Sequence, residues 1–520
     1  MLESMNYKFY TGLLTGAAIL AGCIEQAPVQ KNSMPNVIVI YTDDLGIGDL
    51  SSYGATNVST PNIDNLAENG LRFTNAYSTS AMSTPSRYGL LTGVYPWRKE
   101  NTGIAPGNSG LLIDTATVTV ADIFQRAGYK TGAVGKWHLG LGPSSGPDFN
   151  EYISPNTSDI GFDYEFIIPA TVDRVPCVYV ENGRVVNLDP DDPIYVDYDK
   201  KVGDWPTGEE NPELLKLKPS QGHNNTIVNG ISRIGYMTGG KSALWEDDMI
   251  AHTIISKADE FITENKNNPF FLFFGTHDIH VPRVPHSDFK GKSGMGDRGD
   301  VILQLDWTVG RIIDILNDKG ILENSMIIFS SDNGPVIDDG YHDQAFELLN
   351  GHTPMGIYRG GKYSLYDAGT RVPLIVYWKD KIEAGVQEGR FSQIDFIRTM
   401  AAFLNQPLED EIAFDSQNAL PVLLGEKDFD RNYIVHQNLD NTLSVTANGW
   451  KYFEPSSSDP IEQWTKIELG NNAEPQLYNV EVDPSEKNNL SIENPNKTME
   501  LAKSLDSIRS VNSVNISRQM

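Results

Sequence analysis

The sequence predicts an α/β protein with two parts. Helices flank a mostly parallel central sheet in a large domain, and a smaller C-terminal α+β subdomain carries a short antiparallel sheet. Continuous apolar runs that end in polar residues indicate strands buried on both faces. Helical patterns lie between these runs, and this alternation is typical of a parallel sheet. The 520 residues are 39% hydrophobic and 21% charged, a globular composition that excludes disordered and fibrous classes.

Four strands and three helices are predicted in the large domain. The strands are residues 36–43, 129–138, 270–277 and 326–332, and the helices are residues 117–127, 252–265 and 301–319. Each strand ends in polar residues, and ligands of open parallel sheets bind outside the carboxyl ends of the strands. We therefore expect these polar side chains to meet at one edge of the sheet.

The chain is predicted to divide into four parts. These are a lipoprotein signal peptide (1–22), a tether (23–34), a catalytic domain (35–430) and a C-terminal subdomain (431–520). The last part contains short strand patterns, a turn at Asp483-Pro484 and an amphipathic helix from about Lys497.

The N-terminal segment has the features of an export signal. Lys8 precedes an apolar stretch, and Leu20-Ala21-Gly22-Cys23 resembles a bacterial lipobox. This pattern predicts that Cys23 is lipidated and anchors the exported protein in the bacterial cell envelope, facing the periplasm or the cell surface. A plain signal peptide with a chance cysteine is the alternative. The apolar run is too short for a membrane-spanning helix, which needs about 20 residues.

The net charge is −28, and the second cysteine is Cys177, an unpaired thiol if Cys23 is lipidated. Nucleic-acid binding requires clustered Lys and Arg, and the sequence has no long basic run, so nucleic-acid partners are not expected. Charges are screened beyond about 8 Å at physiological salt, so a local basic pocket can still bind an anion.

Oxygen ligands follow two of the predicted strands. Asp43 and Asp44 end the first strand, and Asp332 and Asn333 end another. Adjacent carboxylates repel each other unless a cation lies between them. Three carboxylates and an amide oxygen suit calcium or magnesium better than zinc. Turn or capping residues are the alternative interpretation.

The run from Ser83 to Arg87 begins a predicted helix. Pro85 is tolerated in the first turn, so Ser83 would lie where backbone N–H groups and the helix dipole favour negative charge. Arg87 follows one turn later and would share the same face. Taken alone, Ser83 is equally consistent with a helix N-cap beside a surface arginine.

Cationic and imidazole groups follow other strand ends. Lys136 and His138 have the two-residue spacing that places side chains on one side of an extended segment. His277 and His280 follow the strand at 270–277, and Lys362 follows two glycines that permit close backbone approach to a ligand. Taken singly, each of these side chains is more often solvated than functional.

Together these motifs resemble those of formylglycine-dependent sulfatases, which belong to the alkaline-phosphatase-like superfamily. The resemblance runs from about Pro35 to about Leu490. It rests on Asp43-Asp44, Ser83 to Arg87, Gly135 to Gly140, Asp332 to Gly334 and Gly360 to Lys362, which occur in the family's order. It implies hydrolysis of sulfate esters, with algal polysaccharides or glycosaminoglycan oligosaccharides as expected substrates.

The resemblance also implies a role for each residue. Ser83 would be oxidised to formylglycine, whose hydrate attacks sulfur and forms a covalent sulfo-enzyme. The modified Ser83 and Asp43, Asp44, Asp332 and Asn333 would hold one calcium ion, which the resemblance favours over magnesium. Arg87 would steady the hydrate, Lys136 and Lys362 would bind sulfate oxygens, His138 would accept a proton, and His280 would protonate the leaving oxygen. His277 is either a substrate contact or a support. Independently of the resemblance, Arg174, His223, Arg283 and His342 are expected to contact sugar hydroxyls or carboxylates of the substrate.

Ser83 departs from the cysteine that many family members have at this position. Serine is converted only by the oxygen-independent type of maturation enzyme, so the resemblance implies such an enzyme as a partner. Two alternatives remain. One is a phosphatase or phosphodiesterase of the same superfamily, typically with two zinc ions and more histidine ligands. The other is a glycan-binding lipoprotein with an inactive sulfatase fold.

Overall fold

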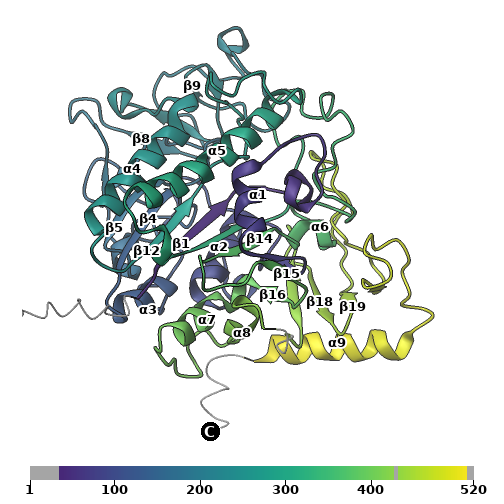
Figure 1. Ribbon diagram of the computed structural model, residues 1–520. Coiled ribbons are helices and arrows are strands. Elements are labelled where there is room, and N and C mark those ends of the chain that lie inside the picture. Colours follow the sequence, from purple (N-terminus) through teal and green to yellow (C-terminus); the bar gives the residue numbers. More distant parts are fainter. Residues whose placement is uncertain (1–33, 427–430, 512–520) are drawn as a thin grey trace, which may run out of the picture. The chain divides into compact units, whose positions relative to one another are not determined.

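The computed structural model describes residues 34–426 and 431–511, so the signal peptide, Cys23 and nearly all of the tether lie outside the described residues. Helices flank a ten-stranded sheet (Figure 1). Its strands, in spatial order, are β15 (Gly385–Gln387), β2 (Leu71–Phe73), β14 (Leu374–Tyr377), β13 (Ser325–Ser331), β1 (Asn36–Thr42), β12 (Phe270–Gly275), β4 (Lys130–Lys136), β5 (Tyr164–Ile168), β6 (Val180–Glu181) and β7 (Arg184–Val185).

The predicted fold class is confirmed by this sheet. The four predicted strands β13, β1, β12 and β4 are neighbours and run parallel, and β5 continues the parallel set. Antiparallel strands border them, with β14 against β13 on one side and β6 against β5 on the other. Shorter two-stranded sheets pair β3 (Ala76–Tyr77) with β16 (Phe391–Ser392), β8 (Tyr195–Asp197) with β11 (Tyr236–Thr238), and β9 (Ile227–Val228) with β10 (Ile231–Ser232).

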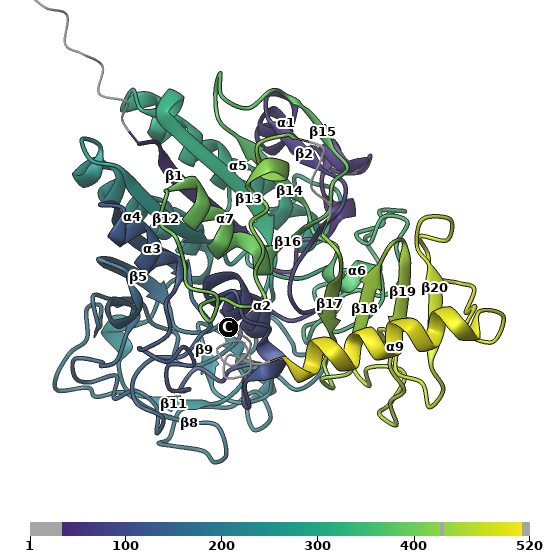
Figure 2. The same cartoon turned by 90° about the horizontal axis from the view of Figure 1, so that it is seen from below.

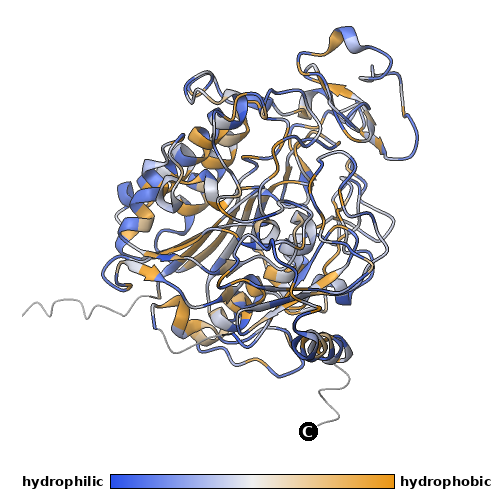
Figure 3. Cartoon of the chain, turned by 90° about the vertical axis from the view of Figure 1, so that its right-hand side faces the viewer, coloured by the Kyte–Doolittle hydropathy of each residue, from blue (hydrophilic) through white to orange (hydrophobic). Residues whose placement is uncertain are grey.

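Alternate residues of the central strands pack against opposite helical layers. Val37 and Val39 of β1 share one apolar cluster with residues of α3 (Val120–Arg126) and α7 (Phe396–Phe403). Ile38 of β1 belongs to a second cluster with α4 (Ile250–Asn265) and α5 (Gly296–Asp318). Figure 3 shows hydrophobic residues gathered on the sheet and on the inner sides of the helices. Burial on both faces explains why the strands are continuous apolar runs.

The other helices are α1 (Pro61–Glu68), α2 (Ser83–Thr92), α6 (Asp367–Thr370), α8 (Leu420–Leu423) and α9 (Pro495–Ser510). Within the described ranges, none has both the length and the apolar character needed to cross a membrane.

The C-terminal part forms a four-stranded antiparallel sheet. Its strands are β17 (Ile434–Gln437), β18 (Leu443–Ala447), β19 (Trp450–Phe453) and β20 (Gln476–Asn479). Helix α9 lies along this sheet (Figure 2) and packs Leu501, Leu505 and Ile508 against it. The domain boundary between residues 430 and 431 stays a prediction.

A buried ion network ties this sheet to α6. Lys451 Nζ of β19 lies 2.8 Å from Asp367 Oδ1 and 3.1 Å from Glu486 Oε1, and all three side chains are buried. Burial raises the pKa of Glu486 to about 7. Burial also acts to raise the pKa of Asp367, but the charges of Lys451 and Arg371 outweigh it and lower that pKa.

Replacing Lys451 with Met should lower the free energy of unfolding by about 3–5 kcal/mol, because the buried Glu486 loses its cation and Asp367 keeps only Arg371. The matched control is Lys257→Met, which removes a partly exposed partner of Glu181 and Glu260. Its effect should stay below about 1 kcal/mol. Chemical denaturation measures both changes, and a loss for Lys451→Met as small as the control's would contradict the role of the network.

Candidate active site

The predicted polar residues meet at the carboxyl edge of the parallel strands. Lys136 Nζ at the end of β4 lies 2.5 Å from Asp43 Oδ2, which follows β1, and 3.4 Å from Asp332 Oδ2, which follows β13. Gly275 at the end of β12 permits this convergence, because a Cβ there would lie 2.4 Å from the Lys136 carbonyl oxygen. Three parallel strands of the sheet, β13, β1 and β4, therefore deliver their charged groups to one point.

Ser83 lies at the N-terminus of α2, beside these carboxylates. Its Oγ is 3.4 Å from Asp43 Oδ1 and 3.3 Å from Asn333 Oδ1, and the hydroxyl can donate to either. The side chain is nearly buried but lines the pocket described below. The first-turn N–H groups of a helix favour negative charge. Ser83 is thus positioned between a cluster of oxygen ligands and a cavity.

The cluster of oxygen ligands consists of the side chains of Asp43, Asp44, Asp332 and Asn333. Asn333 Nδ2 donates to Asp44 Oδ1 at 2.8 Å, so the amide lies between Asp44 and Ser83. Burial raises the pKa of Asp43. Burial also acts to raise the pKa values of Asp44 and Asp332, but neighbouring cations outweigh it and lower both, Lys362 for Asp44 and Lys136 for Asp332.

Three buried cations surround the cluster. Arg87 donates to Asp332 Oδ2 from Nε at 3.0 Å and from Nη2 at 2.8 Å. Lys362 Nζ lies 2.9 Å from Asp44 Oδ2 and 2.7 Å from Asp339 Oδ2. Lys136 pairs with Asp43, as described above. The two lysines and the arginine supply the positive charge that an anionic group would require.

Three of the predicted histidines line the pocket, namely His138, His280 and His223. His138 Nε2 is 3.0 Å from the Ala105 carbonyl oxygen, and its buried Nδ1 has no hydrogen-bond partner in the described chain. Burial and the charge of Lys136 hold the pKa of His138 well below its usual value, so the ring is neutral at neutral pH. His280 Nε2 lies 3.8 Å from Asp44 Oδ2. His277 contacts Asp278 instead and is not among the residues that line the pocket.

The pocket opens beside Ser83 and draws residues from distant parts of the chain. Its lining consists of Ser83, Ile104, His138, Asp173, Arg174, Gln221, His223, Ile234, His280, Asp339, Lys362, Tyr363, Leu439, Glu462, Trp464 and Thr465. Asp339, Tyr363 and Trp464 are lining residues that were not predicted from the sequence. Asp339 follows another aspartate in a loop, and Trp464 lies in the C-terminal part, so no motif marks either of them.

Of the other four predicted substrate contacts, some line the pocket and some lie away from it. Arg174 Nη1 lies 3.0 Å from Asp173 Oδ1, and His223 Nε2 lies 3.0 Å from Asp173 Oδ2, so both flank one carboxylate in the pocket wall. Arg283 is buried outside the lining, where it pairs with Asp343 at 2.6 Å and donates to backbone carbonyls. His342 is exposed and does not line the pocket either. The structure therefore brings two of these four side chains to the cavity.

The donor set fits a hard divalent cation. Ligand atoms of Asp43, Asp44 and His280 lie within 4.8 Å of one another. Asp332 Oδ1 adjoins the backbone N–H of Asp44, and Asn333 Oδ1 adjoins Ser83 Oγ. Within the described chain, the carboxylates at this site are those of Asp43, Asp44, Asp332 and Asp339, and they contact three cationic side chains, Arg87, Lys136 and Lys362. Negative charge therefore exceeds positive charge by one in this group. Buried carboxylates and an amide oxygen are the ligands that calcium and magnesium prefer. With that cation, the site could bind an anionic ester beside Ser83.

Several known proteins are similar to this chain in sequence and fold. The sulfatase family model matches residues 35–405. The N-acetylgalactosamine-6-O-sulfatase of Bacteroides thetaiotaomicron is 64% identical over 500 residues, which cover 96% of this chain and 98% of that protein. Human arylsulfatase A is 30% identical over 475 residues, which cover 88% of this chain and 83% of that enzyme.

A solved structure from work on the metabolism of multiple glycosaminoglycans by Bacteroides thetaiotaomicron agrees at a TM-score of 0.91 and 65% identity. The match covers 92% of this chain and 100% of the solved one. The chain therefore belongs to the sulfatase family and is a sulfuric ester hydrolase.

Proposed function

We propose that the enzyme removes the 6-O-sulfate of N-acetylgalactosamine residues in sulfated glycosaminoglycan oligosaccharides. The observation that carries this proposal is the 64% identity, over 96% of the chain, to the Bacteroides thetaiotaomicron enzyme of that name. The pocket supports it, because Lys362 lines the pocket together with Ser83, and Lys136, paired with Asp43, adds positive charge next to the lining. The wall formed by Asp173, His223 and the half-exposed ring of Trp464 offers hydrogen bonds and an apolar face to a sugar.

We infer that Ser83 acts after oxidation to formylglycine, with loss of two hydrogens to the oxygen-independent maturation enzyme. One hydroxyl of the aldehyde hydrate gives its proton to Asp43, whose Oδ1 lies 3.4 Å from Ser83 Oγ, and attacks sulfur. The sulfur–oxygen bond to the sugar breaks while His280 protonates the leaving oxygen. His138 then accepts the proton of the second hydroxyl. The carbon–oxygen bond to sulfate breaks, and the aldehyde is restored. The neutral ring of His138, with its unpartnered Nδ1, supports this role as a base.

We infer that Asp43, Asp44, Asp332 and Asn333, with the modified Ser83, hold one calcium ion. When bound, calcium supplies Lewis-acid polarisation of a sulfate oxygen. Arg87 fixes Asp332 with two hydrogen bonds and so orients one of the expected ligands. Lys136 and Lys362 can each exchange a carboxylate contact for a sulfate oxygen, which would stabilise the charge of the transition state.

The substrate proposal is tested with matched oligosaccharides and enzyme co-expressed with an oxygen-independent maturation enzyme. The oligosaccharides carry one sulfate, at O6 of N-acetylgalactosamine, at O4 of the same sugar, or at O6 of N-acetylglucosamine. Release of free sulfate should be fastest from the first. Equal or faster release from another would overturn the sugar assignment and leave sulfate-ester hydrolysis intact. Phosphate release by an enzyme holding two zinc ions would instead favour the phosphatase alternative.

Arg174→Ala should raise KM about 10- to 100-fold while kcat changes little. Removing a charged hydrogen-bond donor from the pocket wall costs about 1.5–3 kcal/mol of binding, and the loss is shared by ground and transition states. The control is Lys201→Ala, which removes an exposed ion pair with Glu210 and should leave both constants unchanged. Steady-state kinetics distinguish the outcomes. A fall in kcat with an unchanged KM would contradict a binding role for Arg174.

We also propose that Cys23 carries a lipid that anchors the enzyme in the cell envelope, on the strength of the lipobox-like run that ends at this residue. The Cys23→Ala protein should move from the membrane fraction of the bacterium to the soluble fraction, because an acyl chain supplies membrane affinity in proportion to its length. An unchanged membrane fraction would show that Cys23 is not the anchor.

A further inference from the structure

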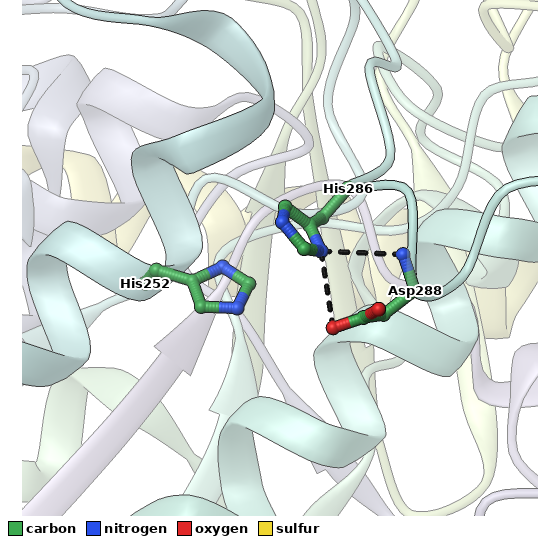
Figure 4. A group of neighbouring side chains, drawn as sticks. All are labelled: His252, His286 and Asp288. Carbon is green, nitrogen blue, oxygen red and sulfur yellow. Dashed lines mark hydrogen bonds and ion pairs between the residues drawn. The ribbon is translucent and has the colours of Figure 1, made fainter.

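A second group of candidate metal ligands lies outside the active-site pocket. His252 is in α4, and His286 and Asp288 lie in the loop that precedes α5. Figure 4 shows the two rings and the carboxylate gathered around a common space. One ring nitrogen of each histidine and one oxygen of Asp288 all lie within 4.8 Å of one another. We propose that these three side chains bind a zinc ion, with solvent at the fourth position.

The pair formed by His286 and Asp288 already has the spacing of two zinc ligands. Nδ1 of His286 is 3.3 Å from Asp288 Oδ2. Zinc bonds to histidine nitrogen and carboxylate oxygen are about 2.0–2.2 Å long, so two ligands of a tetrahedral ion lie about 3.3–3.5 Å apart. The observed distance matches this edge of the tetrahedron.

Nδ1 of His286 has two neighbours, both from Asp288. The backbone N–H of Asp288 donates to this nitrogen at 3.2 Å, and Asp288 Oδ2 lies beside the same nitrogen. A zinc ion bonded to Nδ1 and Oδ2 would replace one backbone hydrogen bond with two metal bonds.

His252 provides the third ligand from helix α4. Its Nδ1 is buried and has no hydrogen-bond partner within the described ranges, which is costly for a polar atom. The ring packs between that of His286, at a centroid distance of 4.3 Å, and that of Trp307, at 4.6 Å. A small side-chain rotation is needed to complete the site, because the group spans up to 4.8 Å.

The loop that carries the other two ligands is also held in place. The backbone N–H of His286 donates to Gln304 Oε1 of α5 at 2.8 Å. The ligand set, two imidazoles and one carboxylate, is the type that zinc takes when one position stays open. Calcium prefers oxygen ligands, so this site differs in chemistry from the carboxylate cluster beside Ser83. Asp288 is exposed, which gives zinc access from solvent.

The test is a calorimetric zinc titration of calcium-saturated, full-length enzyme, with bound zinc counted by mass spectrometry after gel filtration. We expect one zinc equivalent in addition to calcium. The variants His252→Gln, His286→Gln and Asp288→Asn should each weaken zinc binding about tenfold or more. The control is His342→Gln, which changes an exposed histidine outside the group and should bind zinc as the wild type does.

Two results would overturn the proposal. One is wild-type enzyme that retains no zinc after gel filtration. The other is zinc binding of equal strength in the wild type and in all three ligand variants, which would place the ion elsewhere, for example among Asp43, Asp44 and His280. Asp288→Asn alters an exposed side chain and should not affect folding, which thermal melting of each variant checks. Zinc should also raise the melting temperature of the wild type and of His342→Gln, but not that of the ligand variants.

Discussion

Replacing Ser83 with alanine is expected to lower kcat/KM on the order of 10⁴-fold or more. The side-chain oxygen that formylglycine formation requires is absent from this variant, so no aldehyde hydrate can attack sulfur. Stability should change little, because Asp43 keeps its contact with Lys136 when the hydroxyl is removed. Sulfate release from a 6-sulfated N-acetylgalactosamine oligosaccharide measures the loss, and thermal melting checks the fold.

The control for this prediction is Ser83→Cys. A thiol at this position is a substrate for the maturation enzymes that require cysteine, so this variant should be active when co-expressed with one. The alanine variant should stay inactive with either type of maturation enzyme. Activity of Ser83→Ala within about tenfold of the wild type would show that another group is the nucleophile.

Removal of the metal is expected to lower kcat about 10²- to 10⁴-fold. A bound cation contributes several kcal/mol of transition-state stabilisation, and each 1.36 kcal/mol corresponds to a tenfold change in rate. The site has more carboxylates than cationic side chains, so the folded protein should also lose stability when the ion is removed. A ligand present at a hundred times its Kd stabilises the folded state by about 2.7 kcal/mol.

The measurement is sulfate release and melting temperature after dialysis against a chelator, followed by the addition of calcium, magnesium or zinc. Calcium should restore both activity and stability, and magnesium should restore them less well. The matched variant is Asp44→Asn, which removes one charge from the ligand set and should need more calcium for half-maximal activity. Full activity in metal-free enzyme, or recovery with zinc alone, would contradict a hard-cation site.

The central strands could be predicted because each is long enough to show a continuous apolar run. The strands β1, β4, β12 and β13 have six or seven residues and are buried on both faces. The flanking strands were missed because most are only two to four residues long. Their pairing depends on contacts with distant segments, such as β14 against β2, rather than on a local pattern.

The cluster beside Ser83 could also be predicted from the sequence, because its residues directly follow parallel strands that end at one edge. The residues that form the pocket wall could not be predicted in this way. Arg174 and His223 come together through Asp173, and Trp464 arrives from the C-terminal part. A sequence does not distinguish an arginine that faces a pocket from one such as Arg283, which pairs with a buried carboxylate and backbone carbonyls.

The mass of the peptide that contains Ser83 shows whether this residue becomes the nucleophile after oxidation. The enzyme is co-expressed with an oxygen-independent maturation enzyme, its sulfatase activity is measured, and the same sample is digested and analysed by mass spectrometry. We expect the peptide that contains Ser83 to be lighter by a pair of hydrogen atoms, in a proportion that rises with specific activity. Fully active enzyme that contains only unmodified Ser83 would contradict the mechanism.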